Sequence, residues 1–299
     1  MKVGIIGCGY IGLAISEKLQ EAGCEVYGVR RSPGGILAVR ASGANAVTAD
    51  ITEPETFVDI PSVDALIFAA SSGRGNLEQA EAIYNEGLEN VIDHFGQREH
   101  SPNTFLYTSS TSVLGDHDGE LVDETTPRKP ASDKAEILCA AEDIARDRAE
   151  AFDINPIVAR LSGIYGPQRY RLDRYLTTPA VPGYRNFIHR EDVAGAITHL
   201  LLAEYDETSC VHISDSEPVD RQEFVTWIAE QVNAPSPPLV SLEERLEEEK
   251  LSATTVARLR ANKRVDNTRL RNTGYQFTYP TYREGFAQAI ARYGHGAPT

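Results

Sequence analysis

Three glycines near the start of the chain form the first pattern that could do chemistry. The pattern runs Gly7-Cys8-Gly9-Tyr10-Ile11-Gly12, after an apolar segment, Lys2–Ile6, and at the start of a helical pattern, Tyr10–Ala22. In that context the first glycine permits a tight turn, the second lets the backbone approach a pyrophosphate, and the third allows close packing of helix on sheet. The helix start adds amides and a positive dipole for phosphates. We therefore predict that this turn, Tyr10 and Ile11 included, binds a dinucleotide.

Two arginines follow the next apolar segment, Glu25–Val29. The run Arg30-Arg31-Ser32 stands where an NAD site usually carries an acid for the ribose hydroxyls. Two guanidiniums and a hydroxyl can instead form charge-assisted bonds to a 2′-phosphate. This favours NADP(H), with NAD(H) as the alternative cofactor. In a competing interpretation both arginines are ordinary solvated loop residues.

Short apolar runs alternate with helical patterns through the first half of the chain. After the segments above come Asp64–Phe68, Leu77–Phe95, Thr104–Thr108, Ala131–Phe152 and Pro156–Arg160. Such alternation is typical of βαβ units, and continuous apolar strands indicate a sheet covered on both faces. We predict an α/β fold, a Rossmann-type doubly wound parallel sheet with a smaller C-terminal substrate lobe.

The pattern becomes less regular after Gly166, which suggests a division of the chain. We expect residues 1–166 to form the dinucleotide-binding domain, with 187–215 returning to it. Residues 167–186 and 216–299 would then form the substrate lobe.

Charge and composition exclude several classes of partner. The formal charge of −15 opposes nucleic-acid binding, and no apolar run reaches the roughly 18 residues of a membrane span. The four cysteines lack metal-ligand spacing, so no metal is expected. The N-terminal stretch reads as strand and turn, not as a signal peptide, which favours the cytoplasm. The expected partner is a small-molecule substrate, with a homodimer as the candidate assembly.

Five further motifs follow one another along the chain: Ala49-Asp50-Ile51, Ala69-Ala70-Ser71, Thr108 to Gly115, Arg160 to Pro167 and Ile188 to Ala194. In these the chain resembles the extended short-chain dehydrogenases/reductases, the NAD-dependent epimerase/dehydratase family. The resemblance implies that Asp50 and Ile51 lie beside the adenine. It implies that Ala69, Ala70 and Ser71 lie near the nicotinamide ribose. Ser110 falls at the position of the catalytic serine.

The sequence departs from the family at the residue that would donate the proton. Where the family has a Tyr-x-x-x-Lys pair, this chain has Lys134 and Leu138, as in atypical members of the superfamily. Hydride transfer at a carbinol carbon needs a matching proton transfer at oxygen. We predict that Ser110 polarises the substrate oxygen and that Lys134, or a water it holds, supplies the proton, with Tyr165 as a further candidate. In the competing interpretation Lys134 is a surface residue and Tyr165 a loop residue.

Arginines and tyrosines alternate after Gly166, where the resemblance implies substrate-contacting loops. We assign Arg169, Arg174 and His189 to substrate binding and expect an anionic substrate. The alternative is that these are surface arginines that balance an acidic protein. The predicted function is an NADP(H)-dependent oxidoreductase or epimerase of the atypical short-chain dehydrogenase type, acting on a small polar or sugar-like substrate. The alternative is a noncatalytic NADP(H)-binding module that senses redox state.

Overall fold

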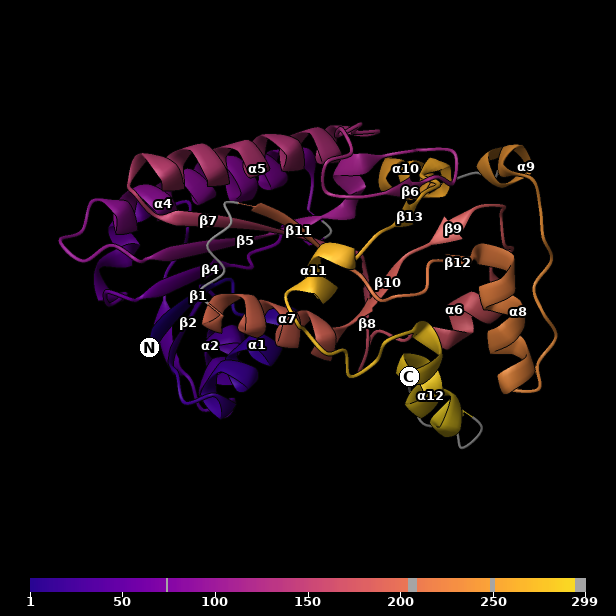
Figure 1. Ribbon diagram of the computed structural model, residues 1–299, viewed down its shortest axis with the longest axis horizontal. Helices are drawn as coiled ribbons and strands as arrows, with labels where there is room; N and C mark the ends of the chain where they lie inside the picture. The colour runs from indigo at the N-terminus through magenta and orange to yellow at the C-terminus, as the bar shows by residue number, and fades with distance from the viewer. Residues whose placement is uncertain (74, 204–208, 248–250, 294–299) are drawn as a thin grey trace. The chain divides into compact units, whose positions relative to one another are not determined.

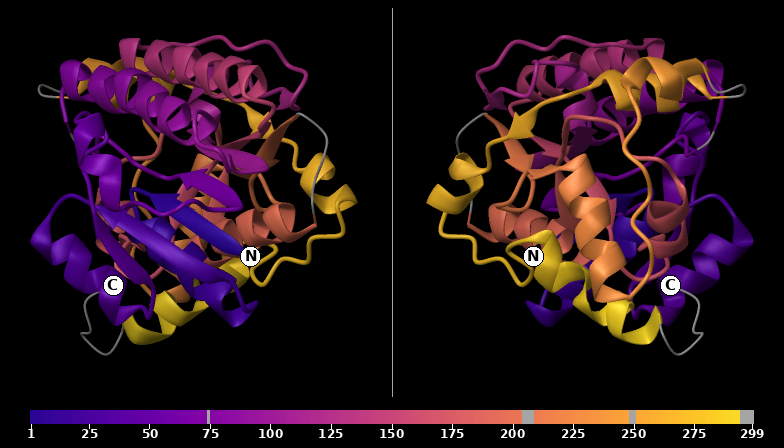
Figure 2. Two further views of the ribbon diagram at one scale, coloured as in Figure 1. Left: turned by 90° about the vertical axis from the view of Figure 1, so that its left-hand side faces the viewer. Right: turned by 90° about the vertical axis from the view of Figure 1, so that its right-hand side faces the viewer.

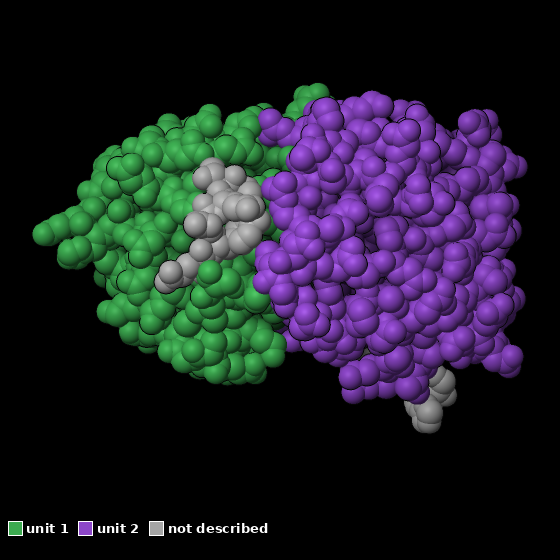
Figure 3. Space-filling model, viewed as in Figure 1, with its two compact units in different colours: residues 1–110, 133–160, 193–211 green, residues 111–132, 161–192, 212–299 purple. Residues whose placement is uncertain are grey.

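The computed structural model describes residues 1–73, 75–203, 209–247 and 251–293. The chain divides into two compact units, each made of three separate segments (Figure 3). Unit 1 comprises residues 1–110, 133–160 and 193–211. Unit 2 comprises residues 111–132, 161–192 and 212–299.

Unit 1 is built on a seven-stranded sheet. Its strands are β1 (Lys2–Ile6), β2 (Glu25–Arg30), β3 (Asn45–Thr48), β4 (Ala65–Phe68), β5 (Thr104–Ser110), β7 (Asn155–Leu161) and β11 (Ser209–Ile213), in the order β11-β7-β5-β4-β1-β2-β3. β1 pairs in parallel with both β2 and β4. The order reverses at β1 and β4, and ligands of open α/β sheets bind at the carboxyl ends of the strands beside such a switch point.

Helices cover both faces of this sheet, as Figures 1 and 2 show. One face carries α1 (Tyr10–Glu21), α2 (Pro33–Ala41) and α7 (Arg190–Leu202), and the other carries α4 (Gly87–Gly96) and α5 (Asp133–Ala151). The buried side of α5 is rich in alanine, which lets the helix approach the strands closely. The predicted three-layered doubly wound sheet is confirmed.

The predicted helix Leu77–Phe95 is interrupted. It consists of α3 (Leu77–Glu81), a single π-helical turn η2 (Ala82–Glu86) and α4. Turns of this kind are rare and frequently lie at functional sites. The 3₁₀ turn η1 (Pro54–Asp59) precedes β4.

Unit 2 contains three pairs of short strands. β8 (Gly163–Tyr165) is parallel to β10 (Phe187–His189), β6 (Leu121–Val122) is parallel to β13 (Arg264–Val265), and β9 (Tyr184–Arg185) is antiparallel to β12 (Val219–Asp220). The remaining elements are η3 (Thr111–Leu114), α6 (Leu172–Thr177), α8 (Arg221–Gln231), α9 (Leu242–Glu247), α10 (Ala253–Arg260), α11 (Thr268–Asn272) and α12 (Tyr282–Tyr293).

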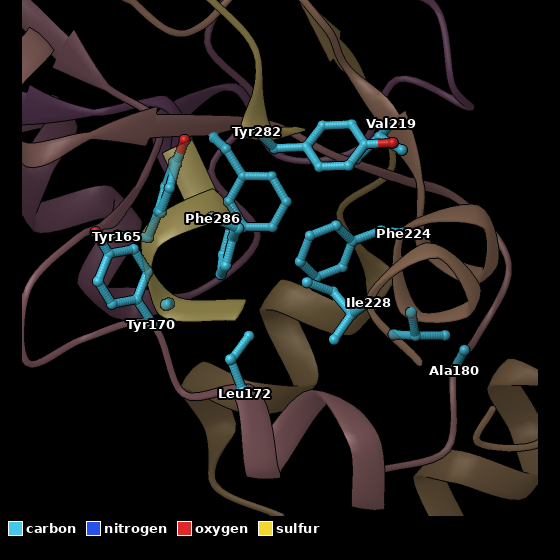
Figure 4. Close-up of a cluster of buried hydrophobic side chains, with 12 residues drawn as sticks. Tyr165, Tyr170, Leu172, Ala180, Val219, Phe224, Ile228, Tyr282 and Phe286 are labelled. Atoms are coloured by element: carbon cyan, nitrogen blue, oxygen red, sulfur yellow. The ribbon is translucent and has the colours of Figure 1, made fainter. Parts of the chain in front are cut away.

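An aromatic core holds unit 2 together (Figure 4). Tyr165 stacks on Phe286 of α12 with ring centroids 4.4 Å apart and planes at 4°. Phe224 of α8 packs edge-on against Phe286 and Tyr282. Gly285 is required beneath Tyr165, because a Cβ there would collide with the tyrosine ring and hydroxyl. This core ties β8 and β10 to α8 and α12.

The units differ from the predicted segments at residues 111–132, 161–166, 187–192 and 212–215, all of which belong to unit 2. Residues 111–132 belong to unit 2, because β6 pairs with β13. Residues 161–166 and 187–192 also belong to unit 2, because β8 pairs with β10. The functional division into a nucleotide domain and a substrate lobe stays a prediction. No helix in the described ranges is long and apolar enough to cross a membrane.

Candidate functional site

The glycine-rich turn between β1 and α1 has the conformation that its sequence predicts. Gly7 adopts φ +79°, and a Cβ on it would collide with the backbone of Ala70. The Gly7 and Cys8 amides donate to the Val29 carbonyl at 3.2 and 3.1 Å, which locks the turn onto β2. A Cβ on Gly12 would lie 3.2 Å from the Gly7 carbonyl and from Ile5. Gly7 therefore has to be glycine, and a side chain at Gly12 would push its neighbours aside.

Arg30 extends from the end of β2 over this turn. A Cβ built on Gly9 would lie 2.6 Å from Arg30 Nη1, and one built on Gly35 would lie 2.6 Å from Arg30 Nε. The half-buried Arg30 side chain therefore lies between the glycine turn and the start of α2. A guanidinium in this position faces the adenosine end of a Rossmann site.

Arg31 and Ser32 make different contacts. Arg31 is exposed and pairs with Asp50 Oδ2 at 3.3 Å. Ser32 is the N-cap of α2 and accepts from the Gly35 amide at 3.2 Å. Burial alone would raise the pKa of Asp50, but hydrogen bonds from Thr52 and the charge of Arg31 together lower it below its usual value. Of the two arginines, Arg31 thus forms an ion pair with a carboxylate, and Arg30 forms none within the described ranges.

The loops after β3 and β4 border the same turn. Asn90 of α4 donates to the Ile51 carbonyl at 3.1 Å, and Gly87 leaves room for the Ile51 side chain. The Ala69 amide donates to the Ile6 carbonyl at 2.8 Å, so Ala69 and Ala70 continue β4 beside Gly7. The predicted cofactor residues therefore come together along one edge of the sheet.

Tyr84 and Lys134 fasten the loop that follows β4. Tyr84, in the π turn, donates to Ser71 Oγ at 3.3 Å and accepts from the Ser72 amide at 3.4 Å. The Lys134 ammonium, at the start of α5, donates to Ser72 Oγ at 3.0 Å and to the Gly73 carbonyl at 3.3 Å. Lys134 is half-buried. Sequence reasoning gave Tyr84 no role in this site.

Ser109, next to Ser110, belongs to a buried ionic network. Ser109 Oγ donates to Glu142 Oε1 at 2.6 Å, and Arg160 donates to both Glu142 oxygens at 2.9 and 2.8 Å. Although burial opposes the change, the bonds to Glu142 raise the pKa of Arg160. Because side chains alternate along a strand, Ser110 points to the other side of β5 from Ser109. The network anchors the strand end that carries Ser110.

The signal that could have found this network is Glu142 itself. It is fully buried on the alanine-rich side of α5, where an acid requires a partner.

Two predicted residues of unit 2 are buried in its aromatic core. Tyr165 is 1% exposed, and its hydroxyl has no hydrogen-bond partner in the described part of the chain. Burial raises the Tyr165 pKa far above its usual range. His189 accepts from the Glu191 amide at 3.2 Å, and its Nε2 lies 3.3 Å from the Tyr170 hydroxyl. Burial and the charge of Arg190 lower the His189 pKa to about 4, so the ring is neutral at pH 7.

Arginines of unit 2 cluster around Tyr175. The Arg185 guanidinium lies 5.2 Å from the Tyr175 ring, and its Nε has no partner in the described ranges. Burial and the charge of Arg174 lower the pKa of Arg185. Partial desolvation and the charges of Arg174, Arg185 and Arg171 lower the pKa of Arg258. Among the residues that the structure describes, no carboxylate pairs with these four guanidiniums.

The cluster brings together only some of the predicted substrate residues. Arg174 belongs to it, whereas His189 lies in the aromatic core and Arg169 is exposed in the loop after Gly166. No sequence pattern indicated Arg258, which α10 provides. Cationic side chains with no acidic partner repel one another and so favour an anion among them.

Comparison with known proteins agrees with this geometry. The family model described as the NAD dependent epimerase/dehydratase family matches residues 3–210. Protein YeeZ of Escherichia coli strain K12 is 33% identical over 214 residues, which cover 68% of this chain and 73% of YeeZ. The bacterial protein YtcB of Bacillus subtilis strain 168, described as an uncharacterized UDP-glucose epimerase, is 29% identical over 126 residues, or 42% of this chain and 39% of YtcB.

Solved structures match nearly the whole chain. A functionally unknown conserved protein from Silicibacter pomeroyi DSS is 27% identical with a TM-score of 0.76, covering 98% of this chain and 99% of that one. DesIV, a dTDP-glucose 4,6-dehydratase from Streptomyces venezuelae solved with NAD and TYD, has a TM-score of 0.77 at 16% identity, covering 99% and 98%. At that identity DesIV shares the fold with this chain.

Proposed function

The chain belongs to the NAD-dependent epimerase/dehydratase family, and from that premise we propose that it is an NADP(H)-dependent oxidoreductase or epimerase acting on a small, polar, anionic substrate. The observation that carries the cofactor preference is the Arg30 side chain between Gly9 and Gly35. A glycine turn of this kind lets a pyrophosphate approach the backbone, and Arg30 would offer a 2′-phosphate a charge-assisted, two-point contact. When bound, NADP(H) supplies or accepts a hydride.

Titration calorimetry tests the preference. We expect wild type to bind NADPH more tightly than NADH. Hydrogen bonds to charged groups contribute about 1.5–3 kcal/mol each, so Arg30→Met should weaken NADPH binding roughly 10- to 100-fold and leave NADH binding nearly unchanged. Arg31→Met should have a smaller effect, because Arg31 is exposed and pairs with Asp50. Arg40→Met, an exposed arginine at the end of α2, is the charge control. Equal affinity of wild type for both cofactors would contradict the proposal.

The arginine cluster around Tyr175 supports an anionic substrate. Arg171, Arg174, Arg185 and Arg258 concentrate positive charge in a protein whose formal charge is −15. Guanidiniums bind phosphates and carboxylates by paired hydrogen bonds, which makes a phosphorylated or carboxylated substrate the best fit. Inorganic pyrophosphate is a simple probe for this charge class.

Ser110 and Lys134 are the residues that we propose for the chemical step. Ser110 ends β5 at the carboxyl edge of the sheet, and Lys134 lies at the start of α5, beside the loop after β4. Ser110 would polarise the substrate oxygen, and Lys134, or a water it holds, would supply the proton. Tyr165 is the weaker proton source, because its hydroxyl is buried in the aromatic core.

Two substitutions test these roles over a panel of carbonyl substrates, with NADPH affinity measured separately. Ser110→Ala and Lys134→Met should each reduce turnover about 100-fold or more while NADPH still binds. An active Lys134→Met protein would remove Lys134 from the mechanism.

A noncatalytic NADP(H)-sensing module is the second candidate. Lys134 stands where the family has its tyrosine, and Leu138, at the lysine position, is buried. The sensor is favoured if wild type binds NADPH with altered hydrogen exchange in unit 2 but turns over no substrate in the panel. A cytoplasmic location and a homodimer remain predictions from the sequence.

A further inference from the structure

The C-terminal end of α10 is held by an unusual contact. α10 (Ala253–Arg260) buries none of its residues, so apolar packing does little to fix its position. The last carbonyls of a helix have no partner within the helix and carry its negative dipole end. In this chain Arg221 of α8 receives them. It donates to the Leu259 carbonyl at 2.8 Å, to the Arg258 carbonyl at 3.3 Å and to the Ala261 carbonyl.

The same guanidinium also holds β9. Arg221 Nε donates to the Tyr184 carbonyl at 3.2 Å, and its Nη1 donates to the Pro182 carbonyl at 3.1 Å. A Cβ on Gly183 would lie 2.9 Å from the side-chain oxygen of Asn262 and in ordinary contact with Arg221. Asn262 adds a second link, because its side-chain oxygen accepts from the Tyr184 amide at 3.0 Å. One buried side chain therefore joins two segments that have no strand pairing with each other.

Those two segments carry arginines of the cluster around Tyr175. Arg185 follows Tyr184 in β9, and Arg258 provides one of the α10 carbonyls that Arg221 binds. Burial, and to a lesser extent the positive charges of Arg185 and Arg258, lower the pKa of Arg221 to about 10. If no hydrogen bonds joined α10 to β9, the repulsion among these guanidiniums would push the weakly packed α10 away from β9.

We infer that Arg221 is a positioning residue for anion binding in unit 2: through five backbone carbonyls it holds Arg185 of β9 and Arg258 of α10 close enough to grip one anionic group. Its own guanidinium is occupied by carbonyls and does not contact the anion. This inference rests on the proposed anionic substrate. To that proposal it adds Arg221 as the residue that keeps the arginines of β9 and α10 together.

The experiment compares Arg221→Lys, Arg221→Met and Arg174→Met with wild type. Calorimetry measures the affinity for inorganic pyrophosphate with saturating NADPH present, so that the predicted pyrophosphate site in unit 1 is already filled. The affinity for NADPH is measured separately. Hydrogen exchange follows residues 253–261 and 184–185. Arg292→Met, an exposed arginine on α12, controls for the loss of one charge.

Arg221→Lys keeps the charge but has three donors for five bonds. We expect it to weaken pyrophosphate binding about fivefold or more and to speed exchange in residues 253–261, with NADPH affinity within twofold of wild type. Arg221→Met should weaken pyrophosphate binding at least tenfold. Arg174→Met should weaken pyrophosphate binding without changing exchange in α10, as expected of a residue that contacts the anion directly.

The outcomes separate the two proposals. If the Arg221 variants bind pyrophosphate as wild type does, the positioning role is refuted and the anionic substrate stands. The positioning role is also refuted if Arg221→Lys weakens binding with α10 exchange unchanged. If wild type binds no pyrophosphate while NADPH binds, the anionic-substrate proposal and the inference from it both fail. Should Arg221→Met not fold, Arg221→Lys alone decides.

Discussion

Replacing Glu142 by glutamine should remove a large share of the stability of unit 1. Glu142 is fully buried and accepts three hydrogen bonds, one from Ser109 and two from Arg160. Glutamine keeps the volume but removes the negative charge and turns one oxygen into a donor facing the guanidinium. Breaking a buried ion pair from one side costs about 3–5 kcal/mol, against a total of about 5–15 kcal/mol for a typical domain.

Urea unfolding gives the measurement. Far-UV circular dichroism follows the whole chain, and the fluorescence of Trp227, the single tryptophan, reports on unit 2. We expect Glu142→Gln to lower the free energy of unfolding by about 3–5 kcal/mol. Ser109→Ala, which leaves the ion pair intact, should cost only about 1–2 kcal/mol.

A double substitution, Glu142→Leu with Arg160→Met, separates charge from packing. Apolar residues of similar volume often replace a buried pair without loss, so the double variant should be more stable than Glu142→Gln. The reasoning is refuted if Glu142→Gln loses less than about 1 kcal/mol. It is also refuted if the double variant is the less stable of the two, because the cost would then lie in packing.

Three further predictions follow from single residues. Gly9→Val should abolish stabilisation by NADPH in a thermal-shift assay while the fold persists, because the new side chain would displace the Arg30 guanidinium and block the approach of the pyrophosphate to the turn. Gly34→Ala, with no atom within 4 Å of its Cβ, is the control, and a Gly9→Val protein that NADPH still stabilises would contradict the site. His189, with its pKa lowered to about 4, binds fewer protons when folded than when unfolded between about pH 4 and pH 6.5, so stability falls as the pH drops through that window. Wild type should therefore lose about 2–3 kcal/mol more than His189→Gln between pH 7 and pH 4.5 in urea unfolding, and parallel losses would disprove the burial argument. Tyr165→Phe should leave stability unchanged or raise it by about 1 kcal/mol, since the hydroxyl has no partner in the described ranges, and a clear loss would reveal a bond to it.

The cofactor edge was predictable because its signals are local. Gly12 meets only atoms of its own βα unit, Gly7 turns the chain where that unit passes from strand to helix, and Arg30 follows the next strand directly. A short window of sequence contains both the residues and the reason for them. The resemblance to a family then ordered the later motifs along the same sheet.

Contacts between distant segments could not be predicted in this way. Arg258 joins Arg174 and Arg185 only because Arg221 fixes the end of α10 beside β9, and no local pattern marks that arrangement. The bond from Lys134 to Ser72 likewise joins α5 to a loop 62 residues earlier. Sequence spacing could place Lys134 at the tyrosine position but could not show what its ammonium binds.

The interleaving of the two units has a consequence for biosynthesis. β11, at one edge of the seven-stranded sheet, is translated after most of residues 111–192 have left the ribosome, and many of those residues belong to unit 2. At about 5–20 residues per second, the roughly 50 residues between the end of β7 and the start of β11 take on the order of 2–10 s to make. During that interval β7 has an open edge where β11 will later pair, and unpaired strand edges invite pairing with other chains. A nascent chain stalled before residue 209 should therefore bind chaperones that recognise exposed strands, and the full-length folded chain should not.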